Sequence, residues 1–462
     1  MKNTHIRKIV LVLSLLLIIS CEDFVEIDAP PHRINGQEVF NDAETAQSAI
    51  RGVYNQLVRL DYSGGWQNSI TALAGLSGDN LGALRPSNIT YLEFTQHEIL
   101  PENSRNLGLW SSAYNVIYMT NAIIEGLENS TIAEDLKLSL YGQAKFIRAF
   151  TYFYLTNLYS EVPLLLSTDF EDNSRASRNS KTEIYQQIII DLTEAIELLP
   201  GDYINDDRTT VNLHTARALM ARVKLYLENW NQAETLSSQV ISETGKYELL
   251  DSLDQVFLPN SREALWQISP IGRGNNLTQT NEGSIFIIHP TFPTSSDFKL
   301  NESFIALYEP NDLRLNHWIG FHEVLEVYYP FKYKDQNSTN NLTEYSMVMR
   351  LSEQYLIRAE ARMNLGNIEG AITDINILRK RAGIELILAE NLTGDELFQI
   401  IQDERRRELF SEWGHRWFDL KRTGRASEIF GSNPLWQDTD VRYPIPEQER
   451  MKNANLTQNP GY

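Results

Sequence analysis

The chain has a single cysteine, Cys21, among its 462 residues. One cysteine cannot form an internal disulfide, and it excludes a zinc site built from several thiolates. Basic residues are also few, since 41 Lys and Arg stand against 61 Asp and Glu and give a formal net charge of -20. Nucleic-acid phosphates would repel such a chain, so we expect no nucleic-acid partner.

The N-terminal apolar run is too short to span a membrane. Residues 9–19 are apolar except for Ser14, and as a helix they would cover roughly 16 Å of a ~30 Å hydrocarbon core. A basic start and a small residue before Cys21 complete the pattern of a secretion signal. We therefore expect residues 1–20 to be a lipoprotein signal peptide and Cys21 to carry the lipid. A buried strand is the alternative, but it would not need the basic start.

The segment that follows Cys21 has no helical period. It contains Pro30, Pro31 and Gly36, and the pattern becomes helical from Asp42. We expect residues 21–40 to form a flexible lipidated tether and residues 41–462 to form the folded domain. With Cys21 lipidated, no thiol would remain for catalysis.

Motifs of common enzymes are missing. The sequence has no Gly-x-Gly-x-x-Gly or Walker loop, and the spacing around Ser77 does not fit a nucleophile elbow. His322-Glu323 resembles the start of a zinc-protease helix, but Glu326 stands where the second histidine is required. We expect no catalysis, no metal and no cofactor, although 61 carboxylates leave a glycosidase acid pair open.

Helix starts recur along the chain. A hydroxyl precedes a glutamate by three residues at Thr131, Ser180 and Thr393, which predicts three capping boxes. The stretch 144–159 is aromatic on most sides, so we expect a central helix that is covered almost all round.

An internal repeat is the strongest architectural signal. At a constant offset of 138 residues, Ala221, Leu227, Asn229 and Ala233 match Ala359, Leu365, Asn367 and Ala371. Each block, 211–244 and 350–383, has the length of a tetratricopeptide unit. Two further pairs are predicted, 42–60 with 104–128 and 133–158 with 181–199. The fold class predicted is therefore mainly α, a tetratricopeptide-like scaffold of helix pairs (an αα solenoid) with helical repeats over about 42–244 and 350–383.

Residues 245–349 have a different texture. Short apolar pieces alternate with Asn, Gly, Pro and Thr clusters, which indicates a long loop-rich insertion with short strands and short helices. Long loops on a rigid scaffold are where binding usually resides.

The most distinctive local sequence lies between Asp403 and Arg422, where arginines alternate with acids and aromatics. An anion or nucleic-acid site is one interpretation. We favour a structural clamp in which Glu404 and Glu408 pair with nearby arginines, Arg416 pairs with Asp419, and the two aromatics that follow Arg416 are buried.

This segment also carries a family resemblance. Glu-Arg-Arg-Arg-Glu-Leu at 404–409 and Gly-His-Arg-Trp-Phe-Asp-Leu-Lys-Arg at 414–422 resemble the C-terminal hallmark of the SusD/RagB family of outer-membrane nutrient-binding lipoproteins. The likeness extends over most of the chain, at 144–149, 162–164, 359–361, 376–383 and 443–446, and the hallmark region as a whole spans 403–446.

The resemblance implies a noncatalytic surface lipoprotein. It would capture oligosaccharide, or sometimes peptide, and deliver it to a SusC-like TonB-dependent transporter. Glu22 and Asp23 directly after Cys21 resemble the signal that sends such proteins to the outer face of the outer membrane. A tetratricopeptide-type envelope scaffold that docks protein partners is the competing interpretation.

Ligand residues do not follow from the resemblance, because family members bind through variable loops. Sugars stack their C–H faces on aromatic rings and bond their hydroxyls to amides and carboxylates. For each aromatic in a loop, burial in the core is the alternative. The candidates on these grounds are Trp66, Tyr62, Asp79, Asn80, Phe292, Trp318 and Tyr328, with Phe321 and Tyr329 beside them.

Overall fold

The structure is a computed structural model, and it describes residues 38–293, 296–390 and 392–462. The predicted signal peptide, Cys21 and residues 21–37 of the predicted tether lie outside the described residues. Glu38–Phe40 forms a short 3-10 helix whose Phe40 ring is buried against Gly126. The tether predicted over 21–40 therefore cannot extend to Phe40, because this ring is part of the core.

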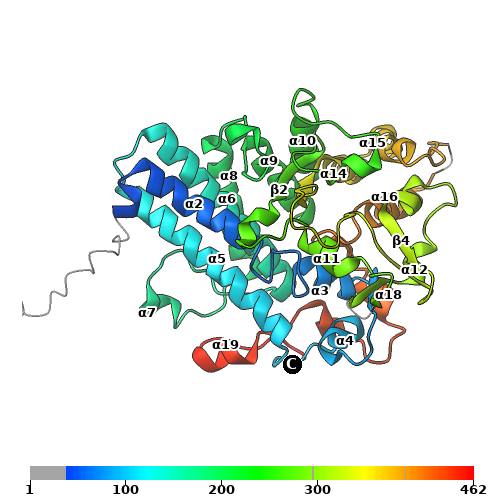
Figure 1. The fold of residues 1–462 in the computed structure, drawn as a ribbon, viewed down its shortest axis with the longest axis horizontal. Coiled ribbons are helices and arrows are strands. Elements are labelled where there is room, and N and C mark those ends of the chain that lie inside the picture. Colours follow the sequence, from blue (N-terminus) through cyan, green and yellow to red (C-terminus); the bar gives the residue numbers. More distant parts are fainter. Residues whose placement is uncertain (1–37, 294–295, 391) are drawn as a thin grey trace, which may run out of the picture.

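The chain is mainly helical, as predicted (Figure 1). The helices of the first half are α2 (Ala43–Leu57), α3 (Ile70–Ser77), α4 (Ile89–Gln96), α5 (Ser104–Glu128), α6 (Glu134–Tyr159), α7 (Phe170–Asn173), α8 (Lys181–Leu198), α9 (Leu213–Tyr226) and α10 (Trp230–Ile241). Those of the second half are α11 (Asn281–Phe286), α12 (Glu302–Ile305), α13 (Leu313–Trp318), α14 (Leu351–Asn364), α15 (Ile368–Arg381), α16 (Gly394–Glu408), α17 (His415–Arg422), α18 (Ala426–Phe430) and α19 (Glu447–Lys452).

The strands are short and most lie in the predicted insertion. One antiparallel sheet has the order β1-β3-β5-β4, and a second pairs β2 with β6 through an irregular register. The strands are β1 (Leu81–Ala83), β2 (Ala264–Ile268), β3 (Phe298–Leu300), β4 (Ile319–His322), β5 (Val327–Pro330) and β6 (Ser346–Arg350). The loop-rich texture predicted for 245–349 is confirmed.

The two helix pairs of the internal repeat are confirmed as α9–α10 and α14–α15. Their turns are alike: Asn229 and Asn367 cap the second helix with nearly the same backbone angles. Each follows a residue with positive φ, Glu228 at 55° and Gly366 at 81°. Three alanines of α9, α10 and α14 form one shared cluster with Leu225 and Ile357, so the pairs stack as a solenoid does.

The predicted earlier pairs also form, since α2 packs on α5 and α6 packs on α8. Helix α6 is buried from Gly142 through Tyr159, which confirms a helix covered on nearly all sides. Its Phe146 and Phe150 rings pack on Trp266 of β2 with centroids 5.4 and 5.0 Å away. The insertion is thereby joined to the helical core.

Two of the three predicted capping boxes are confirmed, at Ser180 and at Thr393. The third is wrong, because α6 begins at Glu134 with Ala133 as its N-cap. Ser130 accounts for the difference: its Oγ donates to Phe40 O and accepts from the N–H of Ile132, whose side chain packs on the core. Tertiary contacts therefore hold this segment in a turn.

The 403–422 segment is a structural clamp, but the predicted pairs are partly wrong. Glu404 does pair with nearby Arg407, while Glu408 is bonded by Arg314, Arg350 and Arg381 from distant segments. Asp419 accepts from Arg405 and Arg422, whereas Arg416 bonds Asp79. Trp417 and Phe418 are buried, as predicted. The long-range pairs form because α13, β6 and α15 each bring one arginine to Glu408 of α16.

Candidate functional site

Three of the predicted ligand residues belong to the core. Tyr62 is 1% exposed and its hydroxyl bonds Thr151 Oγ1 at 3.0 Å. Trp318 is fully buried, donates to Leu253 O, and lies under the Lys332 ammonium 4.8 Å from its ring centroid. Asn80 is buried as well, and its Oδ1 accepts from Arg406 Nε at 2.7 Å. None of the three can reach a ligand in this structure, because protein atoms enclose each side chain.

Asp79 is engaged in the fold. Its carboxylate pairs with Arg406 at 3.1 Å and with Arg416 at 3.0 Å. Its backbone has φ of 58°, in the left-handed region. Asp79 and Asn80 therefore join the turn after α3 to the C-terminal hallmark, which is a structural role.

The remaining candidates are accessible. Trp66 is 42% exposed, Phe292 is 65% exposed, and Tyr328 is half-buried with its ring 4.8 Å from that of Phe321. Tyr329 is half-buried and covers Gly320.

Helix α11 holds the turn that carries Trp66. Asn281 Nδ2 donates to Gly64 O at 2.6 Å and to Val58 O at 3.1 Å. Gly65 has φ of +69°, and a Cβ there would lie 2.2 Å from the Glu282 carboxylate. Glycine is required because the turn and the helix are in direct contact and the backbone is left-handed.

Glu282 is a buried carboxyl beneath this turn. Ser346 Oγ donates to Glu282 Oε1, while Oε2 has no partner among the described residues. Burial raises the pKa of Glu282 from 4.5 to about 7, and the hydrogen bond from Ser346 and the charge of Arg273 oppose this only in part. The base of the Trp66 turn therefore contains a group that titrates near neutral pH.

A polar hollow of about 620 Å³ lies near the Trp66 turn, since Gln67, the residue after Trp66, lies on its wall. Arg85 and Asp297 pair across it at 2.5 Å. Arg105, in the first turn of α5, bonds Thr90 and Asn68 and stacks on the Tyr91 ring. These side chains offer both donors and acceptors around an open space.

A second polar hollow, of about 560 Å³, borders α11. Gln279, His289, Asp335 and Gln336 line it. The Phe292 ring lies 5.2 Å from the His289 ring. A Cβ at Gly283 of α11 would collide with Asp335 O, so α11 contacts both this hollow and the Trp66 turn. No sequence pattern distinguishes these polar residues, because similar residues occur in other loops of the chain.

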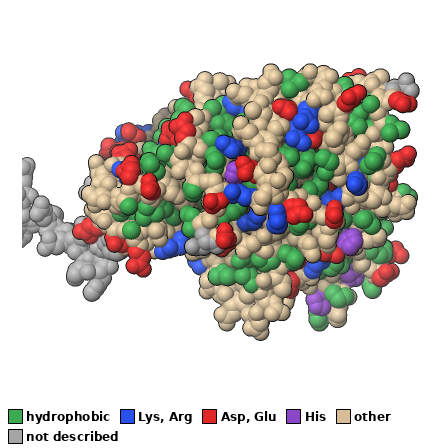
Figure 2. All heavy atoms as spheres, turned by 90° about the horizontal axis from the view of Figure 1, so that it is seen from above, with side chains coloured by type: hydrophobic (Ala, Val, Ile, Leu, Met, Phe, Trp, Pro, Cys, Tyr) green, Lys and Arg blue, Asp and Glu red, His purple; other side chains and the backbone are tan. Residues whose placement is uncertain are grey.

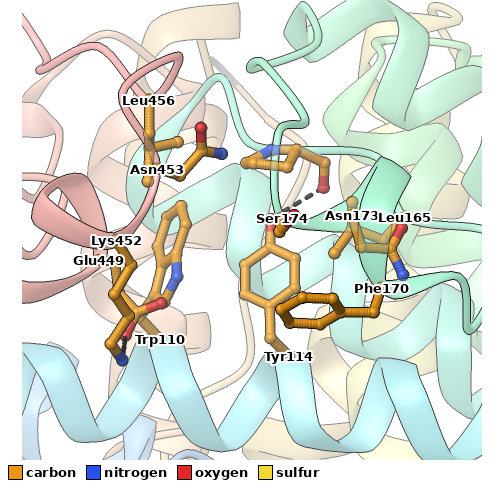
Figure 3. A pocket seen from close by; sticks show the side chains of 11 residues that line it. Trp110, Tyr114, Leu165, Phe170, Asn173, Ser174, Glu449, Lys452, Asn453 and Leu456 are labelled. Carbon is orange, nitrogen blue, oxygen red and sulfur yellow. Dashed lines mark hydrogen bonds and ion pairs between the residues drawn. The ribbon is translucent and has the colours of Figure 1, made fainter.

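A third hollow has a different character. It lies along α5, where α7 and α19 also approach (Figure 1), and Trp110, Tyr114 and Phe170 turn their rings toward it (Figure 3). Its volume is about 380 Å³. These rings could not be predicted as a site from the sequence, since Trp110 and Tyr114 follow the helical period of an ordinary core face.

Charge is mixed on the molecular surface. On the face seen from above, acidic and basic side chains are interspersed (Figure 2). Within the described ranges, no group of three or more His, Cys, Asp or Glu side chains could hold a metal ion. In the same residues, no helix has the length and apolarity needed to cross a bilayer.

Comparison with known proteins identifies the family. A profile described as "SusD family" matches residues 316–462, and one described as "Starch-binding associating with outer membrane" matches residues 46–226. SusD-like protein P2 of Formosa agariphila is 26% identical, over 98% of this chain and 99% of its own length.

Solved structures share the fold. A SusD superfamily protein of Bacteroides vulgatus superposes with a TM-score of 0.81 at 18% identity, covering 92% of this chain and all of the other. A laminarin-binding SusD-like protein gives a TM-score of 0.77 at 23% identity over 91% of this chain and 100% of the other. The helix-pair scaffold, the C-terminal hallmark and these matches agree: the chain belongs to the SusD/RagB family.

Proposed function

We propose that the protein binds an oligo- or polysaccharide on the surface formed by Trp66, Phe292 and the two polar hollows near them. The bound glycan would pass uncleaved to a SusC-like TonB-dependent transporter in the outer membrane. One matching profile is described as starch-binding and associated with the outer membrane, and one related structure is described as laminarin-binding. The observation that carries the proposal is an exposed indole on a turn whose backbone is held by α11, with the next residue, Gln67, on the wall of an open polar hollow.

The chemistry of this surface suits a neutral sugar. An indole face accepts the C–H face of a pyranose, while nearby donors and acceptors take its hydroxyls. Arg85 and Asp297 neutralise each other, so the hollow beside Trp66 offers hydrogen bonds without a net charge from this pair. Asn281 preorganises the turn before the ligand arrives, which lowers the entropic cost of binding.

Replacement of Trp66 by alanine tests the proposal. We expect at least about tenfold weaker binding of the glycan, or ~1.4 kcal/mol, because an aromatic anchor is lost. Isothermal titration against soluble starch, laminarin and xylan would measure it, with Leu388→Ala as the control because Leu388 is an exposed apolar residue on another loop. Equal affinity of W66A and the wild type would contradict the proposed surface. Shorter products after incubation would contradict the noncatalytic role, and binding of peptides alone would favour a peptide ligand.

The anchor is tested at Cys21. We propose a lipidated Cys21 and an outward-facing domain. Two or more acyl chains make membrane attachment stable, so Cys21→Ala should move the protein from the membrane fraction to the soluble fraction and abolish incorporation of labelled palmitate. Protease treatment of intact cells should remove the wild-type domain. An unmodified Cys21 in the mass spectrum of the mature protein, or survival of the domain under protease, would contradict this part.

A further inference from the structure

The groove along α5 is larger than the hollow in Figure 3. A neighbouring hollow of about 270 Å³ shares Tyr114, Leu165, Phe170 and Asn173 with it, so the two hollows adjoin and together make up the groove. Its floor is one face of α5, where Trp110, Tyr114 and Tyr118 recur at the helical spacing. Two adjoining hollows along one helix suit a linear ligand.

Two of its rings face solvent to an unusual degree. Phe170 is 82% exposed and Tyr118 is 55% exposed. Soluble proteins rarely expose several large apolar side chains side by side. A cluster of them at a groove therefore indicates a binding surface. Tyr114 is half-buried in the groove, and its ring packs on the buried ring of Trp110 with centroids 4.9 Å apart.

The segment that carries Phe170 is fixed in place. Asn121 of α5 donates to Leu165 O at 3.0 Å and to Ser167 O at 3.2 Å. Tyr114 donates to Pro163 O at 2.8 Å, and Asp169 caps the short helix α7 at the N–H of Asp172. The groove is therefore formed before any ligand binds, which favours affinity.

The opposite wall does not select a charged ligand. Glu449 and Lys452 of α19 pair with each other at 2.7 Å and lie at the rim. Ser174 and Asn173 add neutral polar groups beside the rings. Aromatic faces bordered by hydroxyl, amide and self-neutralised charged groups fit a sugar chain better than a strongly charged peptide.

We propose that this groove is a second carbohydrate-binding site, used by the same polysaccharide that binds beside Trp66. The proposal rests on the proposed function. Helix α5 connects the two sites, because Arg105 in its first turn lines the hollow beside Trp66. Tyr114 lies nine residues further, about 14 Å along the axis, on the opposite side of the helix at 100° per residue. A long glycan that engages both sites would gain avidity that a short one lacks.

The test compares long and short ligands. The double variant Y118A/F170A should bind the polysaccharide at least about tenfold more weakly, as expected when one of two linked sites is lost. Its affinity for a short oligosaccharide of the same glycan, which reports the Trp66 site, should stay within about twofold. Affinity electrophoresis in gels containing laminarin, soluble starch or xylan measures the affinity for the polysaccharide. Titration calorimetry measures the affinity for the oligosaccharide. The single variant Phe170→Trp keeps an aromatic ring at this position, so its retardation in the gel should equal that of the wild type. Leu388→Ala should also behave as the wild type.

The outcomes separate the two proposals. Residual polysaccharide binding by W66A that disappears in W66A/Y118A/F170A supports a second site. Equal retardation of Y118A/F170A and the wild type overturns the groove and leaves the Trp66 site intact. Loss of all polysaccharide binding in W66A would also contradict the groove as a second site, because the groove is intact in that variant. A wild type that binds none of the three polysaccharides contradicts both proposals, and unfolding curves confirm that each variant is folded.

Discussion

Glu408→Gln is expected to lower the unfolding free energy by about 3–5 kcal/mol, the cost of breaking a buried ion pair by removing one partner. Glu408 is fully buried. Its Oε1 accepts from Arg350 Nη1 at 2.5 Å and from Arg381, and its Oε2 accepts from Arg314 Nη1 at 3.1 Å. A glutamine would place a neutral amide against three guanidinium groups that cannot return to water.

The surrounding charges make the loss severe. Arginine neighbours hold the pKa of Glu408 well below its usual range, so the carboxylate is ionised at neutral pH. In the variant, Arg314 would still pair with Asp312 and Glu404. Arg350 and Arg381 would have to share Glu263. Arg350 would also keep its ion pair with Glu412. Fewer carboxylates would then compensate the same buried cations.

Glu428→Gln is the matched control. Glu428 is 61% exposed in its side chain and pairs with Arg425 three residues earlier. Exposed pairs of this kind contribute about 0–1 kcal/mol, so this variant should unfold close to the wild type. Urea unfolding at pH 7, with the midpoint and slope compared for both variants, measures the difference. A midpoint of E408Q equal to that of E428Q would show that the network is not needed for stability.

Glu282→Gln is expected to change how stability depends on pH. Burial raises the pKa of Glu282 to about 7 in the folded protein, against about 4.5 when unfolded. The folded state therefore binds this proton more tightly, which contributes stability that is complete below about pH 4.5 and is lost as the pH rises through 7. Between pH 5 and 8 the wild type should lose about 2 to 3 kcal/mol relative to E282Q.

The comparison isolates one group. Glu344 also has a pKa raised to about 7 by burial, but it is present in both proteins, so its contribution cancels. Glu390→Gln, at an exposed position, controls for the loss of a surface carboxyl. Urea unfolding at half-unit steps from pH 5 to pH 8 gives the difference curve. A difference that stays constant with pH would mean that Glu282 does not titrate in this range.

Residues that reveal the family are residues of the core. Glu404, Arg405, Glu408 and Asp419 of the hallmark are buried in ion pairs that connect α16 and α17 to other segments. The surface proposed for the ligand lies elsewhere, on the loops around α11. The hallmark therefore identifies a fold, and the loops decide what that fold binds.

The helical scaffold could be predicted because its signals are local and repeated. The offset of 138 residues, the asparagine caps and the small residues at Ala221 and Ala359 fix two helix pairs before any tertiary contact is known. Thr131 shows where prediction from local signals fails. Its spacing to Glu134 is that of a capping box, yet contacts of Ser130 and Ile132 with distant residues moved the helix start to Glu134.

The candidate site could be predicted only in part. Trp66 and Trp318 both lie near glycine or asparagine in polar stretches, yet one ring is exposed and the other is enclosed by Lys332, Arg350 and Phe257. No sequence pattern identified Phe170 or Tyr118 as a candidate ligand-binding residue. A side chain's exposure depends on residues far away in the chain, which local pattern does not contain.

The sequence by itself determined the family, the helix pairs and the buried character of α6, because periodicity and caps act over a few residues. The tertiary structure alone decided which arginine pairs with which carboxylate, which aromatics reach solvent, and that α11 supports the Trp66 turn. These depend on contacts between residues such as Gly65 and Glu282, more than 200 positions apart. Such contacts form only when segments from both halves of the chain pack together.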